Sequence, residues 1–372
     1  MPAGIVQISC KNFRSYGSLS LGFCSRFVIF CGSNGAGKTN ILEAMSLFSA
    51  GRGLRRAPIA DLNTSGAVPF SWNLELVLEK DGYKTFLTTN AKDGSRSAKI
   101  DNTRTDSLSK FEEIMWILWS IPSMNNIFIG PIAERRGFFD HLVGGYSSGH
   151  RSNLKTLAKL QRERLHVLSH GKDETWLDTL ERKIAEENIK IIRSRCEFVE
   201  ALQDTFNNYP SEFLRPCVSV AGTVEDIYET HDEESAILEI SHILKKERFR
   251  DAEKQVTTVG CHKTFWRVKH STTALESEKC STGEQKAFLI SLILASVRIY
   301  RNIRAGVPVL LLDDLMLHLD KNRRKSLINE LRTLDVQTFL TGTEYDQFED
   351  LQGIAQLYRV EKSICTSSET VA

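Results

Sequence analysis

Three features are absent from this sequence, and each absence excludes a class of protein. No apolar run approaches the roughly 20 residues of a membrane-spanning helix. The longest run, residues 288–297, has ten residues, and two of them are serine. The eight cysteines form no C-x-x-C pair, and we interpret Cys261-His262, the nearest approach to a zinc-ligand spacing, as two unrelated residues. The 48 basic and 47 acidic residues leave a net charge of +1, which excludes a basic tail.

The remaining composition is that of a globular protein. Apolar residues make up 41% and charged residues 26% of the 372 positions, enough for a sizeable core over two or three domains. The first residues lack the charged-then-apolar layout of a signal peptide, so we expect a cytoplasmic protein with no membrane segment and no disulfide framework. Any contact with nucleic acid must then come from local basic patches.

Alternating apolar residues predict a strand-rich N-terminal region. Residues 1–31 and 70–106 alternate in this way, and the second stretch carries an Asp-Gly hairpin signal that predicts antiparallel sheet. A glycine-rich turn after the first stretch leads into a helix predicted for residues 38–49. A capping-box pattern at 109–112 predicts a second helix that runs toward Trp119.

The middle of the chain, about 131–250, has the apolar spacing of helices. Its stripe breaks at 171–173, which predicts two antiparallel helices packed on each other or on a helical lobe, and polar residues within it argue against a free coiled coil. From about residue 255 the pattern returns to α/β. The elements predicted there are a helix at 283–300 and strands at 307–312 and 336–340. The polar tail from Ser363 is expected to be loose.

The strongest chemical signal is GSNGAGKT at residues 32–39, which fits the phosphate-loop pattern G-x-x-x-x-G-K-[ST] between a strand and a helix. Its glycines let backbone N–H groups wrap around phosphates, and the helix N-terminus favours anions by about 0.3–1 kcal/mol. Lys38 can reach the β- and γ-phosphates, and the Thr39 hydroxyl can bind Mg²⁺. The predicted nucleotide-binding residues of this loop are Gly32, Ser33, Asn34, Gly35, Ala36, Gly37, Lys38, Thr39 and Asn40.

Two further motifs follow in the last third of the chain. The strand at 307–312 ends in Asp313 and Asp314, which places both carboxylates at the edge of a parallel sheet where ligands bind. Asp313 is the expected magnesium ligand, and Asp314 could polarise a water for attack on the γ-phosphate. The segment STGEQ at 281–285 opens the apolar helix and is a second helix start suited to anions. A serine at this position is also a good N-cap in any helix.

Together these motifs resemble the ABC-type ATPases. The 242 positions from Thr39 to Ser281 resemble the spacing of the SMC-like branch, and more narrowly the chain resembles the RecF family of bacterial recombinational-repair ATPases. The segments that carry this resemblance are KNFRSY at 11–16, GSNGAGKTNILE at 32–43, GRGLRR at 51–56, RRGFFD at 135–140, STGEQK at 281–286 and LLDD at 311–314.

The resemblance implies an α/β fold, an ABC-type P-loop ATPase head with a mixed sheet, an antiparallel β lobe and a helical second lobe. The implied parts are an ATPase lobe built from 1–130 and 255–362, a helical lobe at 131–254 and a loose tail at 363–372. ATP would join two heads, with the phosphate loop of one protomer facing the signature of the other. Lys38 and Thr39 would hold ATP and Mg²⁺ in cis. In trans, Ser281 and Gly283 would meet the γ-phosphate, with Asp320 near the same seam. Arg14 is either a further nucleotide contact or a solvated surface charge.

The implied function is ATP-dependent DNA binding in recombinational repair and replication restart, with RecR and RecO as partners. The implied ligand is double-stranded DNA, either plain or at single-strand junctions. We expect a slow, DNA-stimulated ATPase, because Asp314 is one methylene shorter than the glutamate typical of ABC enzymes and a misplacement of about 1 Å can cost roughly 10²-fold in rate. The alternative is an ATP-switched DNA clamp with incidental hydrolysis. The long helical insert argues against a third interpretation, a transporter subunit.

DNA contacts are expected from two basic patches, each of which could instead be a solvated face. Their members are Arg52, Arg55 and Arg56 in the first, and Lys92, Arg96, Lys99 and Arg104 in the second. For Arg135 and Arg136 a packed, structural role is the competing interpretation. The chain departs from the family at 260–265, where GCHKTF replaces G-P-H-R-D-D, and at Cys280, where a small apolar residue is more usual.

Overall fold

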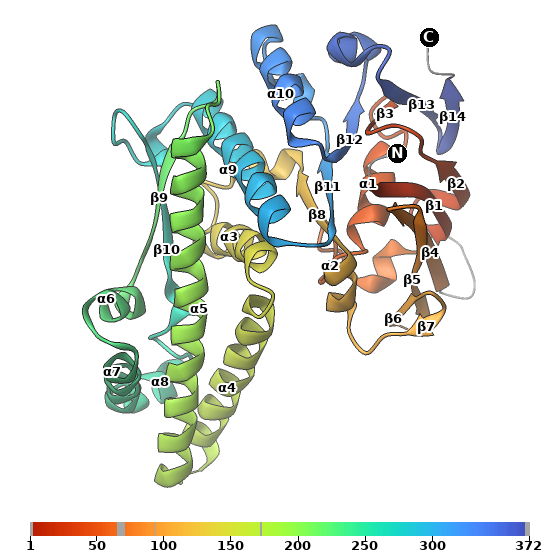
Figure 1. The fold of residues 1–372 in the computed structure, drawn as a ribbon. Coiled ribbons are helices and arrows are strands. Elements are labelled where there is room, and N and C mark those ends of the chain that lie inside the picture. Colours follow the sequence, from red (N-terminus) through yellow and green to blue (C-terminus); the bar gives the residue numbers. More distant parts are fainter. Residues whose placement is uncertain (1–2, 65–70, 93, 172, 369–372) are drawn as a thin grey trace. The chain divides into compact units, whose positions relative to one another are not determined.

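The structure, a computed structural model, describes residues 3–64, 71–92, 94–171 and 173–368. The chain divides into two compact units (Figure 1). We call Met1–Met124 together with Tyr300–Ala372 the sheet unit, and Asn125–Ile299 the helical unit. None of the helices in the described ranges is both long enough and apolar enough to cross a membrane.

The first sheet of the sheet unit is antiparallel, with the order β2-β1-β4-β5-β6-β7. Its strands are β1 (Gly4–Phe13), β2 (Tyr16–Gly22), β4 (Ser71–Lys80), β5 (Tyr83–Lys92), β6 (Ser95–Ile100) and β7 (Thr103–Arg104). Alternate residues of β4, such as Trp72 and Leu76, are buried in the core. Asp81 and Gly82 both have positive φ, as a tight hairpin of this hand requires. The predicted antiparallel region is confirmed over the described residues.

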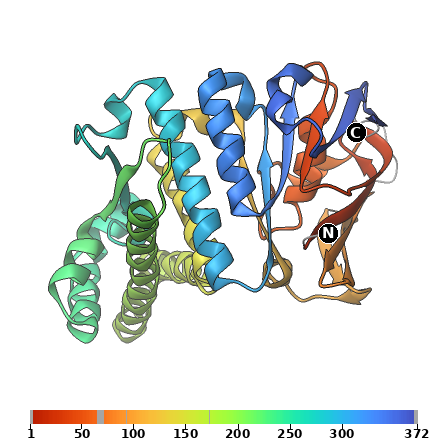
Figure 2. The same cartoon turned by 45° about the horizontal axis from the view of Figure 1, so that its top comes forward.

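The second sheet is mixed, with the order β14-β13-β3-β12-β11-β8. Its strands are β3 (Phe27–Cys31), β8 (Met115–Ser120), β11 (Val307–Leu312), β12 (Gln337–Gly342), β13 (Ala355–Glu361) and β14 (Ile364–Ser368). All neighbours are parallel except β13 and β14. Because parallel strands end at one edge, the residues that follow β3 and β11 come together there. Figure 2 shows the last strands, in dark blue, beside the first ones, in red.

Short helices complete the sheet unit. They are α1 (Lys38–Ser46), α2 (Phe111–Ile114) and α10 (Lys321–Leu334), with the 3₁₀ turns η1 (Ile59–Leu62), η2 (Leu108–Lys110), η6 (Leu315–His318) and η7 (Tyr345–Leu351). The turn η3 (Pro122–Asn126) leads into the helical unit, and α9 (Thr282–Ile303) leads back from it. Both the helix predicted after the glycine-rich turn and the one predicted at 283–300 are confirmed.

The helical unit contains two long helices that pack on each other, α4 (His150–His170) and α5 (Glu174–Asn208). The predicted helix pair is therefore confirmed. The other elements are α3 (Ile132–Tyr146), α6 (Thr223–Thr230), α7 (Glu233–Lys246), α8 (Arg248–Lys254), η4 (Cys261–Lys263), η5 (Ser277–Lys279) and an antiparallel strand pair, β9 (Pro216–Ala221) and β10 (Phe265–His270).

Buried charges fix the interior of the helical unit. Arg195 is fully buried and donates twice to Asp140, at 2.9 Å each, and to the Thr264 hydroxyl at 2.6 Å. Arg135 is also buried and donates to the Phe128 carbonyl and to Glu278. These contacts give Arg135 the packed, structural role that competed with a functional one, and Arg136 makes a longer contact of 3.4 Å with the Thr264 carbonyl.

Three expectations were wrong. Residues 115–119 belong to β8 rather than to a helix, because a short apolar run fits a buried strand as well as a buried helix and periodicity does not separate them. The helical middle contains β9. The tail from Ser363 is not loose over its described part, since 364–368 pair with β13 through backbone hydrogen bonds that side-chain polarity does not reveal.

Candidate nucleotide-binding site

The phosphate loop lies between the end of β3 and the start of α1, as the motif predicts. Gly37, the N-cap of α1, has φ +111, in the region that favours glycine. Gly32 has no room for a side chain, because a Cβ there would lie 2.1 Å from the Val360 carbonyl oxygen. The glycines therefore answer two separate needs, the backbone conformation at Gly37 and close approach to β13 at Gly32.

Lys38 is folded over its own loop. Its ammonium donates to the carbonyl oxygens of Gly32 at 2.7 Å and Ser33 at 3.0 Å, and the residue is buried. An ammonium carries three donors that rotate freely, so they can be shared between these carbonyls and an anion. The ammonium is thus held at the mouth of the loop in which phosphate oxygens are expected.

Thr39 and Asp313 meet across the sheet edge. The Thr39 hydroxyl lies 2.9 and 3.0 Å from the two carboxylate oxygens of Asp313, which also accepts from Thr341 at 2.8 Å. Asp314 follows with φ +48, and its N–H donates to the Thr341 hydroxyl at 2.8 Å. Burial, with a smaller contribution from the Asp314 charge, raises the pKa of Asp313 against the hydrogen bonds from Thr341 and Thr39. The sheet therefore brings Lys38, Thr39, Asp313 and Asp314 together.

Arg14 is anchored to a buried carboxylate on α1. Its guanidinium donates to both oxygens of Glu43, at 2.9 and 2.7 Å, and to the Asp61 carbonyl at 2.8 Å. Arg55 donates to the same carboxylate at 3.1 Å and to the Asn40 side chain at 2.8 Å. Glu43 was missed by the sequence analysis, although a glutamate between Leu42 and Ala44 on an apolar helix face was a usable signal.

The signature residues Ser281 and Gly283 belong to the helical unit. Ser281 and Glu284 form a reciprocal capping box, in which Glu284 N–H donates to the Ser281 hydroxyl at 3.3 Å and Ser281 N–H donates to the Glu284 carboxylate at 2.7 Å. Gln285 is buried and donates to the Ser277 and Cys280 carbonyls. The N-cap role is present, and Ser281 itself is exposed at the start of α9.

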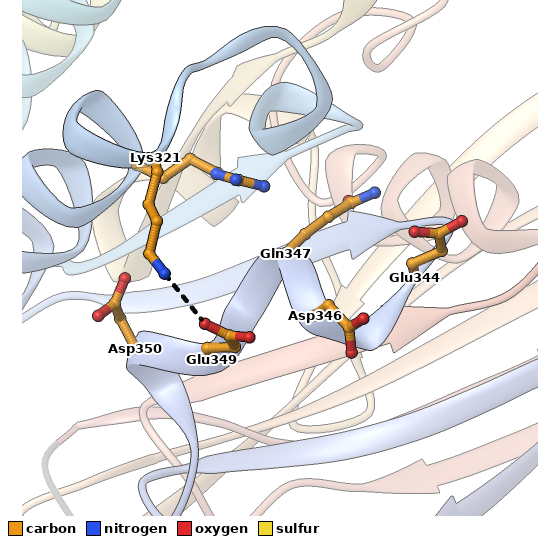
Figure 3. Close-up of a pocket in the computed structure, with 7 residues that line it drawn as sticks. Lys321, Glu344, Asp346, Gln347, Glu349 and Asp350 are labelled. Atoms are coloured by element: carbon orange, nitrogen blue, oxygen red, sulfur yellow. Dashed lines mark ion pairs between the residues drawn. The ribbon is translucent and has the colours of Figure 1, made fainter.

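Asp320 caps α10 and accepts from the Arg323 N–H at 2.9 Å. Beyond it, a surface pocket of about 300 Å³ lies between α10 and η7 (Figure 3). Its lining residues are Lys321, Arg324, Glu344, Asp346, Gln347, Glu349 and Asp350. Four carboxylates dominate this lining and none of the phosphate-loop residues contributes, so the pocket is not suited to nucleotide phosphates.

The predicted DNA-contact residues differ in availability. Six of them are exposed: Arg52, Arg55, Arg56, Lys92, Lys99 and Arg104. The Arg55 guanidinium, however, is already paired with the Glu43 carboxylate. Arg96 is used inside the fold, where it donates to Thr89, to the Gly51 carbonyl at 2.7 Å and to the Leu47 carbonyl, and burial lowers its pKa to about 10. We therefore leave Arg96 out of the proposed contact set.

Comparison with known proteins identifies the family. The model of the RecF/RecN/SMC N-terminal domain matches residues 4–366. Two proteins named DNA replication and repair protein RecF are each 34% identical to this chain. The one from Mesorhizobium japonicum aligns over 97% of both chains, and the one from Agrobacterium fabrum over 95% of this chain and 96% of its own. The chain belongs to the RecF family.

Solved structures agree on the fold of this RecF-family chain. A structure described as the recombination mediator protein RecF with ATP in the RecFOR pathway superposes with a TM-score of 0.85 at 23% identity, over 99% of both chains. An Smc head domain from Pyrococcus furiosus superposes with a TM-score of 0.53 at 16% identity, over 98% of this chain and 96% of its own. The fold is that of an ABC-type ATPase head, as expected.

The raised pKa of Asp313 predicts that this carboxylate lowers the stability of the folded protein at neutral pH, although the proposed magnesium site needs it. A carboxyl with a raised folded-state pKa favours folding below its unfolded pKa, and that contribution is lost as the pH rises through the folded value. Asp313→Asn should therefore raise the melting temperature of the nucleotide-free protein at pH 7, by roughly 2 °C if the change is about 1 kcal/mol. The gain should shrink as the pH is lowered toward about 4. Thermal unfolding measured across this pH range tests the prediction.

The matched control is Asp320→Asn, because Asp320 is exposed and asparagine is an equally good N-cap. Its melting temperature should stay at the wild-type value. A lower melting temperature for Asp313→Asn at pH 7 would contradict the account of burial given above.

Proposed function

We propose that this protein is an ATP-dependent DNA-binding protein of recombinational repair and replication restart. ATP binding drives head-to-head dimerisation on DNA, and slow hydrolysis resets the dimer. The observation that carries the proposal is the meeting of Lys38, Thr39, Asp313 and Asp314 at one sheet edge. The names of the relatives, DNA replication and repair proteins, support the cellular process.

The phosphate loop holds ATP, with Lys38 at the β- and γ-phosphates. A hydroxyl and a carboxylate within 3.0 Å of each other fit Mg²⁺, which takes oxygen ligands and is commonly held by one or two protein groups plus phosphate oxygens. Within the described ranges, no group of three or more acidic, histidine or cysteine side chains forms a more complete metal site. Mg²⁺ would neutralise charge on the phosphates, and Arg14, positioned by Glu43, would contact the nucleotide.

Asp314 is the proposed general base. Thr341 fixes its backbone N–H and lies 3.3 Å from its side chain, so the carboxylate has a defined place beside the magnesium ligand. Its short side chain leaves it farther from the attacking water than a glutamate would be, and the expected consequence is slow turnover.

The second face of the nucleotide comes from a second copy of the chain. Ser281 and Gly283 open the exposed end of α9, whose N-terminus favours anions, and Asp320 lies near the same seam. The proposed functional division is an ATPase lobe of residues 1–130 and 255–362 and a helical lobe of 131–254. It differs from the division into compact units, in which 255–299 belong to the helical unit. ATP then bridges two surfaces, and it favours the dimer only by its higher affinity for that state.

Double-stranded DNA, either plain or at single-strand junctions, is the proposed nucleic-acid ligand, and RecR and RecO are the proposed protein partners. The proposed location of the protein is the cytoplasm. A clamp in which hydrolysis is incidental remains the second candidate, and the short Asp314 side chain favours it.

Dimerisation is tested by light scattering with and without ATP and Mg²⁺. The wild type should change from monomer to dimer on ATP, whereas Lys38→Met should not bind ATP and Ser281→Arg should not accept it in trans. An equimolar mixture of the two variants should recover dimers, because one composite site then has an intact phosphate loop and an intact signature. No shift for the wild type at any ATP concentration would overturn the dimer mechanism, and no recovery in the mixture would overturn the placement of Ser281 in trans.

Hydrolysis separates the two candidate functions. Asp314→Asn should lose roughly 10²-fold or more in turnover while still forming the ATP-driven dimer, since general-base catalysis contributes about 10²–10⁴-fold. Asp314→Glu should hydrolyse ATP faster than the wild type, because the added methylene moves the carboxylate toward the water. Phosphate release is measured with and without gapped duplex DNA. Turnover that DNA does not stimulate favours the clamp, and an unchanged rate for Asp314→Asn would refute its role as base.

DNA binding by the exposed basic patches predicts a salt-dependent affinity. A plot of log affinity against log salt concentration has a negative slope. Its magnitude should fall by about 0.9 for each ion pair with a DNA phosphate that a substitution removes. The quadruple variant Arg52→Gln, Arg56→Gln, Lys99→Gln, Arg104→Gln should bind a gapped duplex more weakly and with a shallower slope, measured by fluorescence anisotropy with ATP present. Lys155→Gln with Lys159→Gln, two exposed lysines of α4, is the control. Equal slopes for the quadruple variant and the wild type would exclude these patches.

A further inference from the structure

We propose that Tyr16 and the β13–β14 hairpin hold the phosphate loop from behind and thereby aim its backbone N–H groups at the nucleotide. This inference rests on the proposed function, because it takes the loop to be the ATP site. Tyr16 and the hairpin residue Ser363 are positioning residues, since they act through the loop and not on the phosphates.

Two donors fix the carbonyls of the loop. The Ser363 N–H donates to the Ala36 carbonyl oxygen at 2.9 Å, and the Tyr16 hydroxyl donates to the Gly37 carbonyl oxygen at 3.2 Å. The Gly37 oxygen also accepts the Asn40 N–H at 3.0 Å, within the first turn of α1. Both carbonyls that precede Lys38 therefore have partners on the side of Tyr16 and the hairpin.

Because the peptide bond is planar, hydrogen bonds to these carbonyls also fix the direction of the neighbouring N–H groups. In a planar trans peptide, C=O and N–H point in opposite directions. A donor that holds the Ala36 oxygen therefore turns the Gly37 N–H the other way, and a donor on the Gly37 oxygen does the same for the Lys38 N–H. These N–H groups are among those with which a phosphate loop binds anions, so their preorganisation favours the nucleotide before it arrives.

Tyr16 and β13 pack so closely behind the loop that neither Gly37 nor Gly32 has room for a side chain. A Cβ on Gly37 would lie 2.7 Å from the Tyr16 hydroxyl, and one on Gly32 would lie 2.1 Å from the Val360 carbonyl oxygen of β13. Tyr16 is 1% exposed. Both ends of the loop are therefore in contact with this backing, one with Tyr16 and the other with β13.

The hairpin is held in register beside the loop. β13 pairs in parallel with β3, the strand that enters the loop, and Arg359 stands opposite Cys31. Lys362 and Ser363 both have positive φ, as in a tight two-residue hairpin turn. Cys365 of β14 lies at the Tyr16 hydroxyl, and burial together with this thiol raises the pKa of Tyr16, so the hydroxyl remains a donor at neutral pH.

The test compares the affinity of ATP in variants that do and do not lose a donor. Tyr16→Phe keeps the ring and removes the hydroxyl. Because one hydrogen bond is worth about 1 kcal/mol, its Kd for Mg-ATP should rise roughly fivefold by calorimetry. Ser363→Pro removes the N–H and cannot adopt the positive φ, so it should lose more, while Ser363→Gly keeps the N–H and should bind like the wild type.

Tyr358→Phe is the matched control for loss of a buried tyrosine hydroxyl, since its hydroxyl donates to the Gly22 carbonyl oxygen and not to the loop. The substitution leaves in place the β13 backbone at Val360 that approaches Gly32. It should bind Mg-ATP with the wild-type Kd, whatever its melting temperature. The ³¹P resonance of the bound β-phosphate should shift in Tyr16→Phe and stay in place in Tyr358→Phe.

The possible outcomes distinguish failure of this inference from failure of the proposed function on which it rests. A wild type that does not bind ATP overturns the proposed function and this inference with it. A wild type that binds ATP, with Tyr16→Phe and Ser363→Pro binding equally well, overturns the inference alone. An equal loss in Tyr358→Phe also overturns it, because the effect would then be general destabilisation.

Discussion

The hydrogen bonds between Thr39 and Asp313 are the contact on which the proposed chemistry depends, because they join residues 274 positions apart. They form only if β3 and β11 end at the same edge of one parallel sheet with β12 between them. The sheet meets this condition with strands buried among apolar side chains, so the burial of ordinary hydrophobic residues places two polar groups within 3.0 Å. The same burial raises the pKa of the Asp313 carboxyl. The charged form that would bind a cation therefore lowers the stability of the folded protein.

Sequence reasoning located the parts of the site that depend on local order. The strand, loop and helix around Lys38 and the strand before Asp313 were predictable, since glycine spacing and apolar runs report directly on backbone conformation. The failures came from tertiary structure. Residues 115–119 could have formed either kind of buried element, and only pairing with β11 decides for a strand. Arg96 was predicted to contact DNA, but its guanidinium reaches backbone carbonyls that the sequence does not place near it.

Glu43 shows how one buried charge organises several motifs. The carboxylate receives Arg14 from the loop between β1 and β2, and Arg55 from the basic segment after α1. The carboxylate is fully buried and both arginines are partly exposed, so the loss of one arginine leaves the other as the partner of this desolvated charge. The segments proposed to meet nucleotide and DNA therefore share an anchor on the phosphate-loop helix. A movement of that helix would reach both of them.

The hydrogen bond between residues 36 and 363 has a consequence for synthesis. The phosphate loop leaves the ribosome well before its partners, because the strands beside it in the sheet and the turn that holds the Ala36 carbonyl are made some 300 residues later. At roughly 5–20 residues per second, that interval is on the order of tens of seconds. During this time the nascent chain carries the complete phosphate-loop motif without the neighbours that shape it. Nucleotide affinity would then arise only once the turn at residues 362–363 has been made, so that nascent chains without this turn neither sequester ATP nor pair with folded ones.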